Sequence, residues 1–267
     1  MFLSQRATQA EYFDDRERSP AEISDFFSAL ARTNRLFAFA EPFQQLLPRL
    51  LGAKSCRSLS LLDLGAGDGS LGKFLTKWAA RQNWDWRFTN LDISPKALRL
   101  NQSGRNVIGS VLALPFADAS FDVVIASQMT HHLSTEEEVS RHFRETWRVS
   151  RSALLMTDLH RNVFLYGMLW LLFRLQHYPK HFCDDGLLSV RRGWLVRELR
   201  PLVERAGLSD ARLWLRFGTR IILQARKPVS TASDFSGEAH LAAPATTNET
   251  SERCQPADEF YSVRSDK

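Results

Sequence analysis

The amino-acid sequence predicts an α/β fold with a mostly parallel β-sheet. Short apolar runs alternate with segments of helical periodicity along most of the chain. The sharpest junction is Leu61–Gly72, where an apolar run stops at alternating glycines and a helical pattern follows. We expect a strand, a tight glycine loop and a helix there.

The glycine loop is typical of a site for a nucleotide-like ligand. Gly65 and Gly67 permit backbone angles denied to other residues and let a ligand approach the main chain. Dinucleotides use such a loop with their pyrophosphate on the helix N-terminus, and S-adenosylmethionine uses one without a phosphate. A glycine-rich turn without a ligand is the remaining alternative.

Two carboxylates favour a cationic ligand at this loop. Asp63 stands at the carboxyl end of the strand, where it would face the crevice and could meet an amino group. Asp68 adds a second negative charge, which would repel a pyrophosphate. The segment Leu62–Gly69 resembles the first motif of class I S-adenosylmethionine-dependent methyltransferases.

Further motifs carry the resemblance along the chain. Leu114-Pro115-Phe116, Asp118 and Phe121–Val124 are similar to the third and fourth motifs of the ubiquinone and menaquinone methyltransferase group. The resemblance implies a Rossmann-like class I methyltransferase fold with a reversed C-terminal strand. Ser110 departs from the family, which commonly has an acid there to bind the adenine amino group.

The resemblance also implies S-adenosyl-L-methionine as the cofactor. Asp92 ends the second expected strand, where an acid can accept both ribose hydroxyls or simply cap the helix that follows. The full set of implied cofactor-binding residues is Asp63, Gly65, Ala66, Gly67, Asp92, Ile93, Ser110, Val111 and Ser127.

Composition bounds the domain organisation. With 267 residues, of which 44% are hydrophobic, the chain can bury a full core. We expect an N-terminal arm and cap helices over 1–52, a methyltransferase domain over 53–228 and a disordered tail over 229–267. The Ser/Thr/Ala/Pro composition of the tail cannot bury a core.

Charge and cysteine content limit the classes of binding partner and the cellular compartment that we expect. The chain has a formal charge of +5, and the part before Val229 carries +9 because the tail is acidic. These charges are scattered, with no dense basic run interleaved with aromatics, so a nucleic-acid partner is not favoured. Three widely spaced cysteines indicate a reducing compartment and no zinc site, and the polar N-terminus shows no secretion signal.

The flanking elements follow from local signals. Residues up to Arg18 are expected to form a loosely held arm, and Ser19–Glu22 predicts a helix start. A second helix is expected from Glu41-Pro42, and both helices are expected to cap the sheet edge. Further strands are expected near 86–91, 105–109, 121–126 and 153–157, with a closing hairpin of 211–217 and 219–226.

The loop after the fourth strand carries the candidate catalytic residues. His131 and His132 stand where ligands bind in open α/β sheets, so either is a candidate general base for a phenol or enol. A structural role is the equally weighted alternative. No metal site is expected, because adjacent histidines without a matched carboxylate cannot close a coordination shell.

The acceptor site is expected after the fifth strand. Asp158, His160 and Arg161 could contact an acceptor or cap the next helix. The apolar run Val163–Phe173 is too short to span a membrane, which takes roughly 20 residues, and predicts a buried lid or, less favoured, an interfacial helix.

The segment Asp184–Arg192 resembles the Asp-Gly-x-x-Ser-x-Arg-Arg segment of a bacterial subgroup that accompanies polyketide-type biosynthesis. An Asp-Gly turn with a surface basic pair is the alternative. The resemblance adds Asp185 and Arg191 as acceptor-pocket candidates.

These observations predict a methyltransferase acting on a small lipophilic acceptor such as a phenol, quinone or polyketide, with O-methylation preferred over C-methylation. A cofactor-binding protein without catalysis, a nicotinamide-dependent oxidoreductase and an RNA methyltransferase are the alternatives. We expect a cytoplasmic protein with at most a weak contact to a membrane surface.

Overall fold

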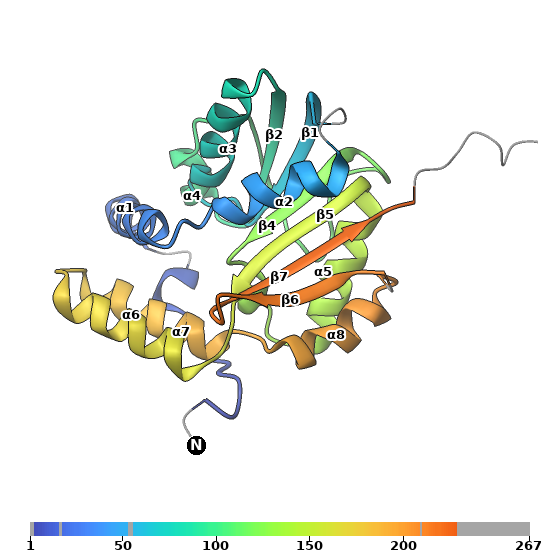
Figure 1. The fold of residues 1–267 in the computed structure, drawn as a ribbon. Coiled ribbons are helices and arrows are strands. Elements are labelled where there is room, and N and C mark those ends of the chain that lie inside the picture. Colours follow the sequence, from blue (N-terminus) through green and yellow to red (C-terminus); the bar gives the residue numbers. More distant parts are fainter. Residues whose placement is uncertain (1–2, 16–17, 53–55, 209, 229–267) are drawn as a thin grey trace, which may run out of the picture. The chain divides into compact units, whose positions relative to one another are not determined.

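Seven strands form one sheet in the described part of the computed structural model, which covers residues 3–15, 18–52, 56–208 and 210–228 (Figure 1). Their spatial order is β3-β2-β1-β4-β5-β7-β6. The strands are β1 (Ser58–Leu64), β2 (Asp85–Asp92), β3 (Arg105–Ile108), β4 (Phe121–Ser127), β5 (Ser150–Leu159), β6 (Arg212–Arg216) and β7 (Arg220–Arg226). The predicted tail lies outside the described residues.

The first five strands are parallel, and β7 runs antiparallel to both β5 and β6. This confirms the predicted α/β fold and its reversed strand. Leu64 pairs with Leu91 on one side and with Ala126 on the other, so β1, β2 and β4 end together. The loops that follow these strands therefore meet at one edge of the sheet.

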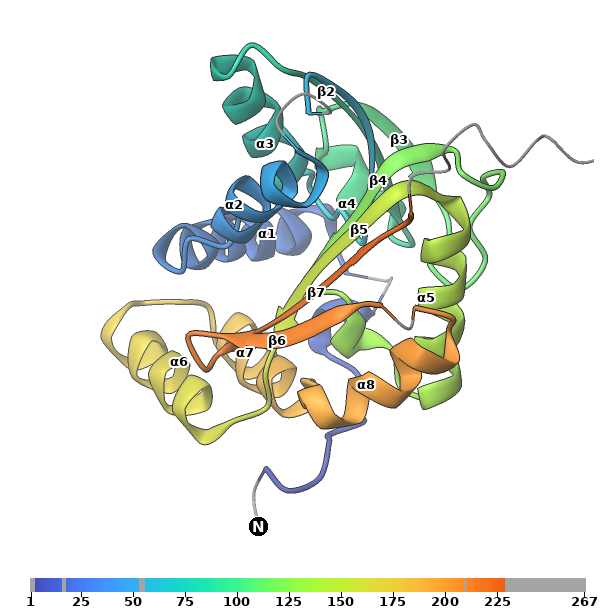
Figure 2. The ribbon, with the colours of Figure 1, turned by 45° about the vertical axis from the view of Figure 1, so that its right-hand side comes forward.

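Helices cover both faces of the sheet (Figure 2). Phe43 of α2 and Leu75 of α3 belong to the core on one face, and Phe143 of α5 and Leu202 of α8 belong to the core on the other. The helices are α1 (Pro20–Leu36), α2 (Glu41–Leu51), α3 (Ser70–Arg81), α4 (Pro95–Leu100), α5 (Glu136–Val149), α6 (Val163–Leu175), α7 (Lys180–Arg192) and α8 (Val196–Arg205).

Local capping explains where the predicted helices begin. The Ser19 side chain accepts a hydrogen bond from the Glu22 amide, and Glu22 accepts one in return from the Ser19 amide. The sequence prediction for the start of α1 is thereby confirmed.

The expected position of α2 is wrong, because its apolar side packs on a face of the sheet rather than on its edge.

The N-terminal segment is held firmly, which corrects the expectation of a loose arm. The Arg6 guanidinium lies 4.0 Å from the centroid of the Trp194 ring. It also donates hydrogen bonds of 2.6 Å to the carbonyl oxygens of Arg192, His131 and Leu133. These partners lie at least 125 positions away in sequence, so the polar composition of the arm did not reveal them.

The helix α6 is only half buried, which corrects the expectation of a buried lid. Leu165 and Leu169 pack into the core between α6 and α7. The opposite side of α6 is exposed and consists of Val163, Phe164, Trp170, Leu171 and Leu175. Among the described residues, no helix combines the length and the apolar character needed to cross a membrane.

The Asp184–Arg192 segment contains no Asp-Gly turn. It forms most of α7, and Gly186 lies inside this helix. A Cβ atom at Gly186 would come within 2.9 Å of the Phe173 ring, so the glycine allows α6 to pack closely on α7.

Candidate functional site

A cavity of about 430 Å³, here called the glycine-loop cavity, opens at the carboxyl ends of β1, β2 and β4. The loop after β1 forms its floor, and α1 covers it with Phe26, Phe27 and Leu30. All nine predicted cofactor-binding residues line this cavity: Asp63, Gly65, Ala66, Gly67, Asp92, Ile93, Ser110, Val111 and Ser127.

Asp63 brings a buried carboxylate without a partner to this cavity. The side chain is 2% exposed, and no described residue hydrogen-bonds to its Oδ2 atom. Burial, together with the charges of Asp92 and Asp68, raises the pKa of Asp63 to about 8. A cation bound beside Asp63 would remove this penalty, because an opposite charge favours the ionised carboxylate.

Asp92 holds the glycine loop in shape. Its Oδ2 accepts a hydrogen bond of 2.8 Å from the Gly67 amide, and its Oδ1 accepts one from the Ser94 amide. Gly67 has φ = +55°, and a Cβ there would lie 2.6 Å from the Phe27 ring. The second strand therefore fixes the loop through one carboxylate, and the loop needs glycine at this position.

His131 is packed inside the protein and is not among the residues that line the described cavities. It is 2% exposed, and its Nδ1 donates to Asp158 Oδ1 at 2.6 Å. Burial opposes ionisation of Asp158, but the charge of His131 and this hydrogen bond lower the pKa of Asp158 below its usual value.

His132 lines the glycine-loop cavity, and a residue of the N-terminal segment orients its ring. Its Nδ1 donates to Asp14 Oδ1 at 2.9 Å, which leaves Nε2 free to accept a proton. Burial alone would lower the pKa of His132, but the bond to Asp14 and the charge of Glu11 raise it. Asp14 and His132 thus form a carboxylate–imidazole pair at the cavity wall.

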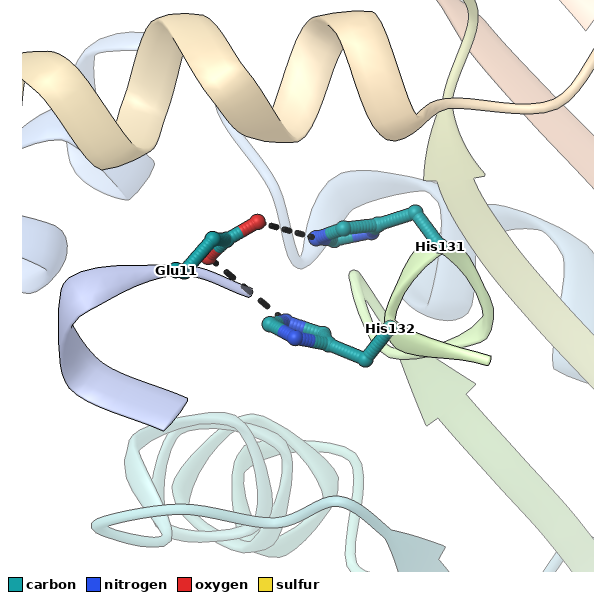
Figure 3. A group of neighbouring side chains, drawn as sticks. All are labelled: Glu11, His131 and His132. Atoms are coloured by element: carbon teal, nitrogen blue, oxygen red, sulfur yellow. Dashed lines mark ion pairs between the residues drawn. The ribbon is translucent and has the colours of Figure 1, made fainter. Parts of the chain in front are cut away.

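Glu11 stands between the two imidazoles (Figure 3). Its Oε1 lies 3.9 Å from His131 Nε2, and its Oε2 lies 4.0 Å from His132 Nε2. These three side chains offer ligand-type atoms that lie within 4.8 Å of one another. The expectation of no metal site rested on the lack of a carboxylate beside the two histidines, and the structure places Glu11 there. Arg192 Nη1 lies 3.7 Å from Glu11 Oε1 and 2.7 Å from Asp14 Oδ2, and provides the positive charge at this cluster.

A second cavity of about 580 Å³, here called the α6 cavity, adjoins the first. Its walls are largely apolar and include Phe37, Phe164, Leu165, Met168, Leu169, Phe173 and Phe182. Both cavities share the lining residues Glu11, Phe26, Leu30, Asn34 and Gln128. Gln128 adopts φ = +54° and donates from Nε2 to Asn34 Oδ1 at 2.9 Å, which fixes this common wall.

The predicted acceptor-pocket residues fall in different places. Asp185 lines the α6 cavity, where it also accepts hydrogen bonds from the Tyr12 and Phe13 amides. Asp158, His160, Arg161 and Arg191 are not among its lining residues. Arg161 is buried, with 3% of its surface exposed. It donates hydrogen bonds to the Gly193 carbonyl and to the Glu198 carboxylate, so it stabilises the fold.

Sequence reasoning missed the contribution of the N-terminal segment to the site. Glu11 and Asp14 come from a stretch whose composition suggested a solvated arm. Glu11 stands directly before Tyr12 and Phe13, and this aromatic pair was the available signal that the stretch is anchored. Phe13 lies 4.2 Å from the Phe26 ring of α1, centroid to centroid.

Comparison with known families matches the central part of the chain. Residues 62–153 match the family described as "Methyltransferase domain". The chain carries a methyltransferase domain. This stretch contains the glycine loop, Asp92 and both histidines. A search of curated proteins found no significant match.

Solved structures share the fold of this methyltransferase at low sequence identity. An S-adenosylmethionine-dependent methyltransferase from Aquifex aeolicus is 16% identical, with a TM-score of 0.52 over 79% of this chain and 99% of the other. One from Thermotoga maritima is 15% identical, with a TM-score of 0.52 over 78% and 99%. A Nostoc punctiforme protein described as a "putative O-methyltransferase" is 15% identical, with a TM-score of 0.51, and the match covers 76% of this chain and 60% of that protein.

S-adenosylmethionine is the cofactor of this methyltransferase, and the glycine-loop cavity fits it. The unpartnered Oδ2 of Asp63 can accept from an ammonium group. A Cβ at Gly65 would lie 2.5 Å from the Met129 side chain, so the close approach of Met129 to this loop requires glycine at position 65. Asp92 ends β2 and lines the same cavity.

Proposed function

We propose that this methyltransferase modifies a small lipophilic acceptor of the phenol, quinone or polyketide type, on oxygen in preference to carbon. The observation that carries the proposal is the apolar α6 cavity, which shares a wall with the glycine-loop cavity. An acceptor with an apolar body in the α6 cavity can present one hydroxyl at the shared wall. Bound S-adenosylmethionine supplies an electrophilic methyl group there.

We propose His132 as the general base, in preference to His131. His132 lines the glycine-loop cavity, whereas His131 is enclosed between Asp158 and Glu11. In this proposal Nε2 of His132 takes the proton of the acceptor hydroxyl. The acceptor oxygen would bond to the methyl carbon as the bond from that carbon to the sulfonium sulfur breaks, which would leave S-adenosylhomocysteine. Asp14 then stabilises the resulting imidazolium through Nδ1. The rest of the contribution is alignment of the two reactants.

The finer family assignment is also part of the proposal. The motifs Leu114–Phe116 and Asp184–Arg192 support the ubiquinone and menaquinone methyltransferase-like group, in its polyketide-associated bacterial subgroup, and hence a role in secondary metabolism. The second motif forms α7, which contributes Phe182, Asp185 and Ser189 to the α6 cavity. Its position beside that cavity supports a role in acceptor binding.

We further propose a weak contact between α6 and an anionic membrane surface. Trp170 and Leu171 are 47% and 51% exposed on the outer side of this helix, and the exposed Arg174 and Lys180 follow in sequence. Phe164 is both exposed and part of the α6 cavity wall. A lipophilic acceptor dissolved in a bilayer would then meet the cavity directly.

The proposed function is tested by methyl transfer in vitro. The purified protein is incubated with isotopically labelled S-adenosylmethionine and separate pools of alkylated phenols, hydroquinones and RNA. We expect a labelled methyl ether from a phenolic pool, identified by mass spectrometry and by loss of the free hydroxyl. Labelling of RNA alone, or cofactor binding without any labelled product, would contradict the proposal.

A further inference from the structure

Two arginines stand in the wall of the α6 cavity, on the hairpin that closes the sheet. Arg216 ends β6 and Arg220 begins β7, and both line this largely apolar cavity together with Thr219. Of the carboxylates in the same lining, Asp185 accepts from two backbone amides and Glu11 lies beside Arg192, so Glu41 is the one that contacts the hairpin. Charged groups in an apolar cavity cost free energy unless they are paired. Their partners therefore indicate what the cavity is built to bind.

Arg216 has a donor without a partner. One of its terminal nitrogens, Nη2, donates to the Glu41 and Gln45 side chains. Its Nε is buried and has no hydrogen-bond partner among the described residues. A buried N–H group without an acceptor is expensive, and an acceptor atom of a ligand would satisfy it.

The Arg220 guanidinium is not in contact with a carboxylate of the described residues. Among the described residues, its two terminal nitrogens donate only to backbone carbonyls, those of Phe39 and Phe37, each at 3.3 Å. No carboxylate of the described residues lies within ion-pair distance of it. Burial lowers the pKa of Arg220, the charge of Glu41 opposes this shift and the charge of Arg216 adds to it.

The charges at this end of the cavity leave an excess of one positive charge. Glu41 contacts Arg216 and not Arg220, so the hairpin end has two guanidinium groups and one carboxylate. A guanidinium presents its N–H groups in a planar fork that matches the two oxygens of a carboxylate. The apolar walls described above accommodate the rest of such a ligand.

We propose that the α6 cavity binds an amphipathic carboxylate, with the anionic group held by Arg220 and the free Nε of Arg216. This inference rests on the proposed function in so far as the ligand is the acceptor, and it then narrows the acceptor class to lipophilic acids. The acid is bound at the hairpin and the hydroxyl to be methylated lies at the wall shared with the glycine-loop cavity.

Calorimetric titration with decanoate and decanol, in the presence of S-adenosylhomocysteine at pH 7.5, tests the inference. The two probes share an apolar chain and differ in the head group. We expect decanoate to bind about tenfold or more tightly than decanol, because hydrogen bonds to charged groups are the stronger class. The variant Arg220→Gln should remove this preference and leave decanol affinity unchanged, and Arg220→Lys should retain part of it.

The matched control is Arg212→Gln, which removes an exposed arginine from the same hairpin. Thermal melting checks that each variant is folded, since Arg220 also holds two backbone carbonyls. Equal affinities for decanoate and decanol, or a preference that survives Arg220→Gln, would overturn the inference. Because the titration requires no methyl transfer, its outcome is independent of the activity assay that tests the proposed function.

Discussion

Asp14 Oδ1 lies 2.9 Å from His132 Nδ1, although 118 positions separate the two residues in sequence. This contact joins the N-terminal segment to the loop after β4 and directs His132 Nε2 away from Asp14. Burial alone would raise the pKa of Asp14, but the hydrogen bonds from His132 and Arg192 hold it well below its usual value. The carboxylate is therefore ionised at neutral pH.

Replacing Asp14 should slow catalysis without weakening cofactor binding. We expect Asp14→Asn to lower kcat by about 10²- to 10⁴-fold, the usual range for a disabled general base. Because Asp14 raises the pKa of His132, the acidic limb of the kcat/KM profile should move to lower pH in the variant. Asp25→Asn, which changes an exposed acid of α1 that lines neither cavity, is the control. An unshifted pH profile would assign Asp14 a structural role.

The glycine loop should tolerate no side chain at Gly67. The variant Gly67→Val is expected to abolish S-adenosylmethionine binding in calorimetric titration, because its Cβ meets the Phe27 ring at 2.6 Å in a left-handed backbone conformation. Gly207→Ala is a matched control, since Gly207 has φ = +87° and open space around it. Wild-type affinity in Gly67→Val would remove the cofactor assignment from this loop.

Asp92 should contribute to cofactor affinity in two ways. It bonds to the Gly67 amide and is the proposed partner of the ribose hydroxyls, so Asp92→Ala should weaken S-adenosylmethionine binding about tenfold or more. Asp85→Ala changes an exposed acid at the other end of the same strand and should have no effect. Similar affinities in these two variants would contradict the ribose assignment.

Asp63 should make the ligand-free protein less stable as the pH rises. Its pKa is about 8 in the folded protein, compared with about 3.9 in an unfolded chain. Between these values the native state holds a proton that the unfolded state has lost, so the free energy of unfolding falls with rising pH. Each pKa unit corresponds to about 1.4 kcal/mol.

Denaturant unfolding from pH 5 to 9 measures this dependence. We expect Asp63→Asn to flatten it, because the amide does not titrate, while Asp85→Asn should retain the wild-type slope. A slope that is unchanged in Asp63→Asn would show that another group causes it. The same variant should lose affinity for S-adenosylmethionine, since the amide carries no charge to attract a cation.

The exposed side of α6 should bind anionic vesicles weakly. In co-flotation with phosphatidylglycerol vesicles, the double variant Trp170→Ser, Leu171→Ser should remove most of the bound protein. Burial of apolar surface contributes about 25 cal/mol per Å², so these two side chains carry much of the interaction. Ile108→Ser removes an apolar side chain that is 64% exposed on β3 and serves as the control. Equal flotation of both variants would contradict the proposed contact.

The parts of the site that sequence reasoning placed correctly are those encoded locally. The glycine loop, Asp63 and Asp92 each stand at the end of a strand, and strand ends of a parallel sheet meet at one edge. The helix start at Ser19 was predicted for the same reason, because a capping side chain bonds within its own first turn.

Contacts between distant segments could not be predicted in this way. The partners of Arg6, the buried position of Glu11 and the pairing of Arg216 with Glu41 depend on which surfaces meet after folding. Polar residues of a terminal segment and arginines of an edge hairpin have the composition of a solvated surface. Their roles become visible only when their neighbours are known.

The sequence by itself determined the α/β fold, the glycine loop and the polar residues at the strand ends beside it, because these features rest on periodicity and on interactions between near neighbours in the chain. Only the tertiary structure decided that His132 rather than His131 lines the cavity, and that the N-terminal segment supplies Glu11 and Asp14. The physical reason is that burial and charge pairing are properties of the folded surroundings of a side chain.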